Sequence, residues 1–280
     1  MFKTRVITAV VLLVLLVAVL LRGGQLGWSV FVLAALLGAF WEWARLGQFG
    51  KSPALVYAIL CTSLCVVAAF NLDMALLNFP LLALAGVFWV AFVPWCLSRV
   101  SVGALANRAV FATVGFVVIA AAGIALLLAK AEGTVFLLST LAICFAADIF
   151  AYVFGKTLGK NKLAPSISPG KSWEGAIGGA FSVMILSWGV VYLSASVPEL
   201  KSSWQVLALE KWHPVLFSLW LLVLSAFSVV GDLFESLLKR RVDMKDSSQL
   251  LPGHGGVLDR IDAQLPVLPL AILLLGVLAV

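Results

Sequence analysis

The sequence predicts an all-α, polytopic integral membrane protein with about nine transmembrane helices. Hydrophobic residues make up 63% of the 280 residues and charged residues only 11%, whereas soluble domains are roughly 45–50% apolar. The mean hydropathy is +1.12. Runs of about 20 apolar residues, long enough to span a bilayer, recur along the chain. Together these observations indicate a membrane protein rather than a soluble domain.

The predicted helices lie near residues 6–21, 28–46, 54–70, 75–97, 109–129, 133–154, 175–195, 214–235 and 264–280. The first follows Lys3 and Arg5 in the manner of a signal peptide, but no small-residue cleavage site stands out after it. We therefore expect it to remain as a membrane helix. Gly175 and Gly179 open the seventh helix with a spacing that permits close helix packing.

The distribution of basic residues predicts the orientation of these helices. With the N-terminus in the cytoplasm, the inside segments collect 15 of the 19 Lys and Arg residues and the outside segments 4. Such a bias is typical of cytoplasmic loops. It places two long loops, 155–174 and 236–263, on the cytoplasmic side. The net charge of +6 then indicates basic loops at an anionic lipid surface rather than nucleic-acid binding.

The segment from Ser236 to Asp262 is the most polar part of the chain. Its charged residues are Lys239, Arg240, Arg241, Asp243, Lys245, Asp246, Asp259, Arg260 and Asp262. Closely spaced acids can hold a divalent metal, and bases beside glycine amides can hold phosphate. Here Gly255 and Gly256 follow His254, which could donate to a phosphate. The alternative is a solvated loop between two apolar segments.

Acidic residues near the ends of the predicted helices suggest a metal site. Asp148 and Asp232 lie near the cytoplasmic ends of the sixth and eighth helices, and Glu235 follows Asp232 on the same face. Asp259 and Asp262 repeat this spacing before the ninth helix, so we expect both to face the same way. Acids within a membrane need partners, and hard oxygen ligands favour Mg²⁺. Asp232 and Asp259 are the strongest candidates, followed by Asp148 and Asp262.

Two further features are ambiguous by themselves. The loop 155–174 carries Lys156, Lys160, Lys162 and Lys171 and would suit a polyphosphate. Trp41 and Trp43 flank Glu42 at the cytoplasmic end of the second helix. Interfacial tryptophans usually form a belt, so Glu42 either reaches water there or lines a site.

These residues resemble a known family. Ser236, Lys239-Arg240, Lys245-Asp246, Leu251-Pro252, His254-Gly255-Gly256, Asp259-Arg260 and Asp262 resemble the signature of the phosphatidate cytidylyltransferase (CDP-diacylglycerol synthase) family. Asp148 to Gly155 and Ser168 to Gly175 resemble two further motifs of that family, with Ile149 and Phe150 in place of small residues. The resemblance covers roughly the C-terminal half of the chain. It divides the chain into N-terminal transmembrane helices (1–130) and a catalytic transmembrane region (131–280).

The resemblance implies a nucleotidyltransferase that converts CTP and phosphatidic acid to CDP-diacylglycerol and pyrophosphate. Its cofactor would be Mg²⁺, alone or with a second, monovalent cation. The implied catalytic residues are Asp232, Asp259, Lys239, Arg240, Lys245, Asp246, His254 and Arg260. The implied substrate-binding residues are Lys171, Ser168, Lys156, Gly255, Gly256 and Tyr152. The implied metal ligands are Asp232, Asp259, Asp148 and Asp262.

The resemblance also favours a homodimer in a bacterial cytoplasmic (inner) membrane, with the N-terminus and the active site on the cytoplasmic side. Two alternatives stay open. One is a CTP-dependent lipid kinase similar to dolichol kinase, which would release CDP instead of pyrophosphate. The other is an ion-coupled transporter using Asp148 and Asp232, although such proteins usually carry paired broken helices in two related halves, and the sequence shows no such halves.

Overall fold

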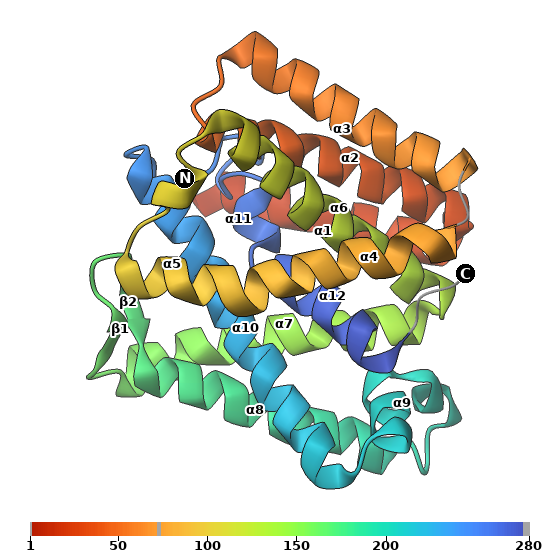
Figure 1. The fold of residues 1–280 in the computed structure, drawn as a ribbon. Helices are drawn as coiled ribbons and strands as arrows, with labels where there is room; N and C mark the ends of the chain where they lie inside the picture. The colour runs from red at the N-terminus through yellow and green to blue at the C-terminus, as the bar shows by residue number, and fades with distance from the viewer. Residues whose placement is uncertain (1, 72–73, 277–280) are drawn as a thin grey trace.

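The computed structural model describes residues 2–71 and 74–276, most of them in helices (Figure 1). The longer helices are α1 (Phe2–Arg22), α2 (Gly24–Leu46), α3 (Lys51–Asn71), α4 (Met74–Val87), α5 (Val93–Arg99), α6 (Arg108–Ala131), α7 (Thr134–Leu158), α8 (Trp173–Leu193), α9 (Trp204–Lys211), α10 (Pro214–Arg241) and α12 (Gln264–Leu275). The short helical turns are η1 (Phe88–Phe92), η2 (Gly103–Leu105), η3 (Pro198–Ser202) and α11 (Leu258–Ile261). The strands are β1 (Lys162–Ala164) and β2 (Ser168–Ser172).

Six helical segments in the described part of the chain are long and apolar enough to cross a membrane: Gly24–Leu46, Asn78–Arg99, Arg108–Ala131, Thr134–Leu158, Trp173–Leu193 and Pro214–Arg241. Each corresponds to a predicted span. The other three predicted spans correspond to shorter apolar helices, Val6–Arg22, Lys51–Val67 and Gln264–Leu275. The last four residues of the ninth predicted span, 277–280, lie outside the described residues. Large apolar side chains such as Leu21, Ile177 and Phe181 are exposed, as expected for surfaces that face lipid.

Helix α6 lies at the centre of the N-terminal half and packs against α2, α4, α7 and α12. The indole Nε1 of Trp43 on α2 donates to the backbone oxygen of Phe111 at 2.8 Å. Gly115 makes room for this indole, because a Cβ there would overlap it. Trp43 is only 2% exposed, so it belongs to the core and not to an interfacial belt. This corrects one of the two interpretations of the Trp41–Trp43 segment.

Helices α7 and α8 form a tightly packed pair. A Cβ on Gly175 would lie 2.6 Å from the backbone oxygen of Ala151, and one on Gly179 would lie 2.6 Å from that of Ala147. The close packing predicted from the Gly175–Gly179 spacing is thus confirmed. It holds the end of α7, which carries Asp148, against the start of α8.

The prediction of an all-α fold missed a small β-hairpin between α7 and α8. Strands β1 and β2 pair antiparallel within the basic loop 155–174. Short strands of this kind lack the long apolar alternation that predicts strands. The hairpin leads directly into α8, where the Oγ of Ser172 accepts a hydrogen bond from the backbone N–H of Gly175 at 3.2 Å.

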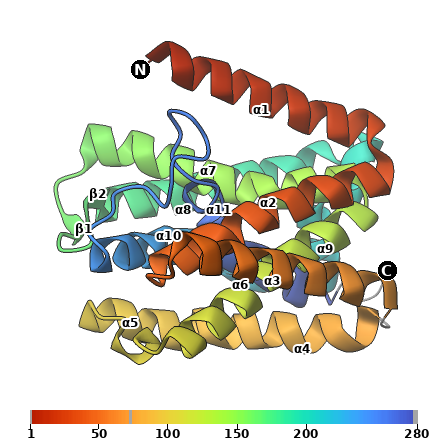
Figure 2. The same ribbon diagram turned by 90° about the horizontal axis from the view of Figure 1, so that it is seen from above.

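The polar segments gather at one end of the bundle. The β1–β2 hairpin, the C-terminal end of α10 and the start of α1 lie at the same end in the view of Figure 2. Helix α10 extends to Arg241, beyond the predicted end at 235, and packs against α5, α7, α8 and α12. On α10, Phe234 is 1% exposed and contacts the rings of Trp43, Phe88 and Trp89. These contacts fix the helix that carries Asp232.

Candidate active site

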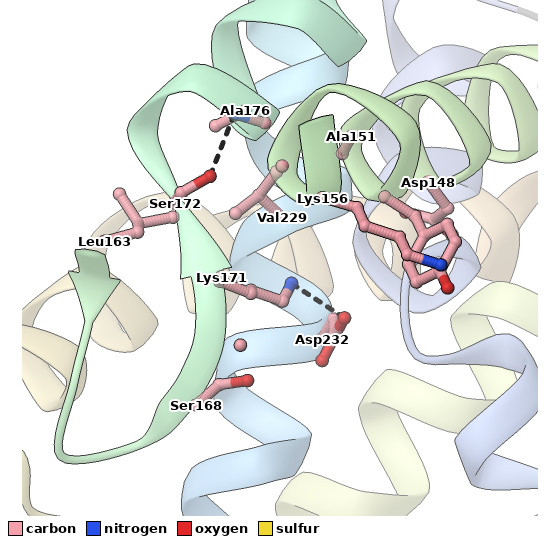
Figure 3. A pocket seen from close by; sticks show the side chains of 14 residues that line it. Asp148, Ala151, Lys156, Leu163, Ser168, Lys171, Ser172, Ala176, Val229 and Asp232 are labelled. Carbon is pink, nitrogen blue, oxygen red and sulfur yellow. Dashed lines mark hydrogen bonds and ion pairs between the residues drawn. The ribbon is translucent and has the colours of Figure 1, made fainter. Parts of the chain in front are cut away.

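A pocket of about 460 Å³ opens between α7, the hairpin, α8 and α10. Helix α7 contributes Asp148, Tyr152 and Lys156 to its wall, while β2 contributes Ser168 and Lys171. Figure 3 shows Lys171 reaching from the strand towards Asp232 on α10. Six of the residues that the resemblance assigned to the substrate or the metal, Asp232 among them, therefore line one cavity.

The pocket is built around an ion pair. The Nζ of Lys171 lies 2.7 Å from the Oδ2 of Asp232, and the two side chains are 22% and 35% exposed. The Oδ1 of Asp232 accepts a longer hydrogen bond from the Oγ of Ser236 at 3.3 Å. Both charges remain partly accessible, so an incoming anion can reach Lys171 and a cation can reach Asp232.

Two further carboxylates lie close to Asp232. Asp148 accepts a hydrogen bond from the Oγ of Ser228 at 2.9 Å. Burial raises the pKa of Asp262 to about 7, and the negative charge of Asp232 contributes to this rise, with a smaller contribution from Asp148. Like charges disfavour the ionised form only at short range. Asp148 and Asp232 therefore line the same pocket, and Asp262 lies close enough for the charges of both to act on it.

Asp259 belongs to a second polar cluster. Its Oδ1 accepts from the Nζ of Lys239 at 2.6 Å, and its Oδ2 accepts from the backbone N–H of Ser247 and Gly256 at 2.9 and 2.7 Å. The same ammonium donates to the Oε2 of Glu235 at 2.7 Å. Burial opposes ionisation of Asp259, but the hydrogen bonds from Lys239 and Gly256 and the charge of Lys239 hold its pKa below the ordinary value.

The four predicted metal ligands differ in their hydrogen-bond and ion-pair partners. Asp259 points to Lys239 and the loop amides, whereas Asp262, three residues later, interacts with Asp232 and Asp148. The backbone stays right-handed helical from α11 through Asp262 and Ala263 into α12, and the charges of both Asp259 and Asp262 act on Glu235. Within the described residues, no group of three or more Asp, Glu, His or Cys side chains is placed to hold a metal by itself.

Glu42, whose role was ambiguous from the sequence pattern, anchors the loop of this second cluster. Its side chain is fully buried. The carboxylate accepts from the hydroxyls of Ser247 and Ser248 and from the backbone N–H of Val257 and Leu258. Glu42 therefore does not reach water at a tryptophan belt. The signal in the sequence was a lone acid between Trp41 and Trp43.

Backbone groups of the glycine turn that was predicted to bind phosphate form hydrogen bonds within the protein. Leu251 and Gly255 form an isolated antiparallel bridge, and Gly255 adopts φ +82°, a conformation that favours glycine. The N–H of Gly256 is occupied by Asp259. The Nδ1 of His254 is buried without a hydrogen-bond partner among the described residues.

The other charged residues predicted to be catalytic lie outside this pocket. Lys245, Asp246 and Arg260 are exposed and do not line the pocket between α7 and α10. Arg240 lines a different pocket of about 380 Å³, with Arg241 and residues from the turn after α5. Their assignments as catalytic residues stay predictions.

Apolar helices long enough to cross a membrane, with a charged pocket at one end, indicate an integral membrane protein, and its class follows from comparison with known proteins. The chain matches the cytidylyltransferase family over residues 3–278 and belongs to that family. It is 37% identical to a phosphatidate cytidylyltransferase of Pseudomonas aeruginosa over 283 residues, covering 96% of this chain and 95% of the relative.

Two other relatives carry the same name. The phosphatidate cytidylyltransferase of Staphylococcus aureus is 32% identical over 280 residues, which cover 98% of each chain. That of Haemophilus influenzae is 42% identical over 138 residues, 49% of this chain and 44% of the relative. The resemblance noted in the sequence is confirmed, and the first two relatives extend it across the N-terminal half.

Proposed function

We propose that this protein is a phosphatidate cytidylyltransferase in phospholipid biosynthesis. An oxygen of the phosphatidate phosphate attacks the α-phosphorus of CTP, a new P–O bond forms, and the bond to the β-phosphate oxygen breaks to release pyrophosphate. The product is CDP-diacylglycerol. The observation that carries the proposal is the pocket in which Lys171 and Asp232 meet at the polar end of the apolar bundle.

The arrangement of charges suits this reaction. The attacking phosphate oxygen is already ionised near neutral pH, so no strong general base is needed. The main barrier is bringing two anions together and stabilising the leaving pyrophosphate, which fixed cations do well in a partly desolvated site. Lys156 and Lys171 line the pocket and can supply that charge.

The donor set of the pocket fits Mg²⁺. This ion is usually bound by one or two carboxylates together with substrate phosphates, not by an all-protein cage. Asp232 and Asp148 line the pocket and would hold it together with the phosphates of CTP, with Asp262 beside them. When bound, Mg²⁺ would neutralise charge on the CTP phosphates. Asp259, with every carboxylate oxygen already hydrogen-bonded, fits this role less well. A second, monovalent cation stays a prediction.

The surroundings of the pocket favour a lipid substrate. Ile149 and Tyr152 on α7 and Trp173 and Ile177 on α8 are more than half exposed, and they border the residues that line the cavity. A phosphatidate headgroup could enter the pocket while its acyl chains stay in the bilayer beside these side chains. We place the pocket and the N-terminus on the cytoplasmic side of a bacterial inner membrane, because 15 of the 19 basic residues fall in the segments of that side.

The test is product identification with purified protein, CTP, Mg²⁺ and either phosphatidic acid or diacylglycerol. We expect pyrophosphate and CDP-diacylglycerol with phosphatidic acid, and no CTP consumption with diacylglycerol. Release of CDP with transfer of a phosphate to the lipid would instead identify the lipid kinase alternative.

Light scattering on the same preparation measures the oligomeric state, for which we expect a dimer. The transporter alternative is disfavoured because the full-length relatives are named as transferases.

A further inference from the structure

We propose that Glu42 is a positioning residue for catalysis: from the N-terminal half of the chain, it holds the loop 247–258 in its active conformation. This inference rests on the proposed function. Glu42 lies on α2, far in sequence from the loop, and the cytidylyltransferase signature in the C-terminal half does not include it.

Four hydrogen bonds join Glu42 to the two ends of this loop. At the first end, the hydroxyls of Ser247 and Ser248 lie 3.0 and 2.6 Å from its carboxylate oxygens. At the second end, the backbone N–H groups of Val257 and Leu258 donate at 2.9 and 2.7 Å. One carboxylate therefore closes the loop by binding both of its ends.

Burial makes this contact sensitive to the conformation of the loop. Glu42 is 0% exposed, and a buried carboxylate is costly unless its oxygens are hydrogen-bonded. The four groups that donate to it all belong to the loop. If the loop moved away, the carboxylate would lose them, and the free energy of that unpaired group would oppose the movement.

The loop in turn places the second polar cluster. The Oγ of Ser247 lies 3.0 Å from both Glu42 Oε2 and Asp259 Oδ2. A hydroxyl has a single proton, so it must be shared between the two carboxylates or alternate between them. Asp259 forms an ion pair with Lys239, which forms a second ion pair with Glu235. Glu235 lies on α10, the helix that also carries Asp232. A chain of direct contacts thus runs from Glu42 to the helix that forms the pocket.

Gly256 lies where the loop packs closely against the carboxylate of Glu42. A Cβ at this position would lie 2.5 and 2.6 Å from the two carboxylate oxygens of Glu42, closer than real contacts allow. Gly256 also donates its N–H to Asp259. Only a residue without a side chain lets the loop contact both carboxylates at this point.

The expected effect of releasing the loop is a loss of turnover. Misplacing a reacting group by about 1 Å can cost on the order of 100-fold in rate. In Glu42→Gln, the amide keeps the size of the side chain but turns one acceptor into a donor that faces loop donors. We expect kcat per folded protein to fall about 10- to 100-fold, with a change in the KM for CTP of less than about 3-fold.

The experiment compares Glu42→Gln with Ser248→Ala and with the control Glu210→Gln. Ser248→Ala removes one of the four hydrogen bonds to Glu42 and also the one that Leu250 N–H donates to the Ser248 hydroxyl. Glu210 is exposed on α9. For each variant, turnover of CTP and phosphatidic acid is measured together with amide hydrogen exchange of the full-length protein without substrate. We expect faster exchange in 247–258 for Glu42→Gln, a smaller increase for Ser248→Ala and none for Glu210→Gln, with exchange in α2 and α10 unchanged.

The outcomes separate positioning from stability. Wild-type kcat in folded Glu42→Gln, or unchanged exchange in the loop, would overturn the proposal. If Glu42→Gln does not fold, Ser248→Ala decides: a several-fold loss of kcat with faster loop exchange supports the proposal, and wild-type values for both refute it. The exchange result does not depend on the reaction. If the wild-type protein makes no CDP-diacylglycerol, the proposed function is refuted. The contact between Glu42 and the loop is still tested by the exchange measurement.

Discussion

Replacing Lys239 by Met should strongly destabilise the protein. The ammonium of Lys239 lies 2.7 Å from Glu235 and 2.6 Å from Asp259, and the side chains of these two acids are only 4% and 5% exposed. Methionine has a similar length but no charge. It would leave two carboxylates facing each other in a buried environment, where repulsion and desolvation both act against the folded state.

The size of the effect follows from this burial. Removing one partner of a buried ion pair typically costs about 3–5 kcal/mol, mainly because the other charge is left unpaired. At about 2–4 °C per kcal/mol for a chain of this size, Tm should fall by about 6–20 °C. If unpaired charge is the cause, neutralising Glu235 as well should restore part of the loss.

The assay is thermal unfolding in detergent of Lys239→Met, Lys239→Met with Glu235→Gln, and the exposed-lysine control Lys201→Met. The control should have the wild-type Tm, and the double variant should lie between the single variant and wild type. A Tm for Lys239→Met within about 2 °C of wild type, or a double variant less stable than the single one, would refute the reasoning. Restored stability with an unchanged KM for CTP in the double variant would also argue against Lys239 as a residue that binds the phosphates of CTP.

Four further predictions concern the pocket and its loops. Lys171→Ala should raise the KM for CTP about 10-fold through loss of one charge-assisted contact, while Lys160→Ala in the same loop should not, as steady-state kinetics at varied CTP will show. Asp232→Asn should lower kcat by about 100-fold without lowering Tm, and near-normal turnover at low Mg²⁺ would remove it from the metal ligands. A cysteine at the exposed Leu250 should resist impermeant thiol reagents in intact cells and react in inverted vesicles; labelling from outside would reverse the topology. The pKa of Asp259 is lowered in the folded protein, so the ionised carboxylate stabilises the fold fully above the ordinary pKa of about 3.9. This stabilisation is lost as the pH falls through the lowered pKa of the folded protein. Asp259→Asn should therefore lessen the loss of stability on acidification below about pH 4, as denaturant unfolding at varied pH will show.

Properties that depend on local composition could be predicted from the sequence. Apolar runs define membrane helices because lipid excludes unpaired backbone polar groups, and the bounds of α2, α6 and α8 agree with the predicted spans to within a few residues. The spacing of Gly175 and Gly179 predicted close packing, since small residues on one face let two backbones approach. The hairpin β1–β2 was missed because its strands are short and contain turn residues such as Pro169 and Gly170.

By itself, the sequence determined that this is a helical membrane protein with its charges gathered in a few loops, and its signature residues identified the family. The pairing of those charges was decided only by the tertiary structure. Asp259 and Asp262 are three residues apart and both act on Glu235, but only Asp259 accepts a hydrogen bond from Lys239, whereas the charges of Asp232 and Asp148 act on Asp262. Glu42 and Leu258 are 216 positions apart and yet share a 2.7 Å hydrogen bond. A buried carboxylate must find its donors somewhere, but the spacing of residues along the chain does not reveal which distant backbone will supply them.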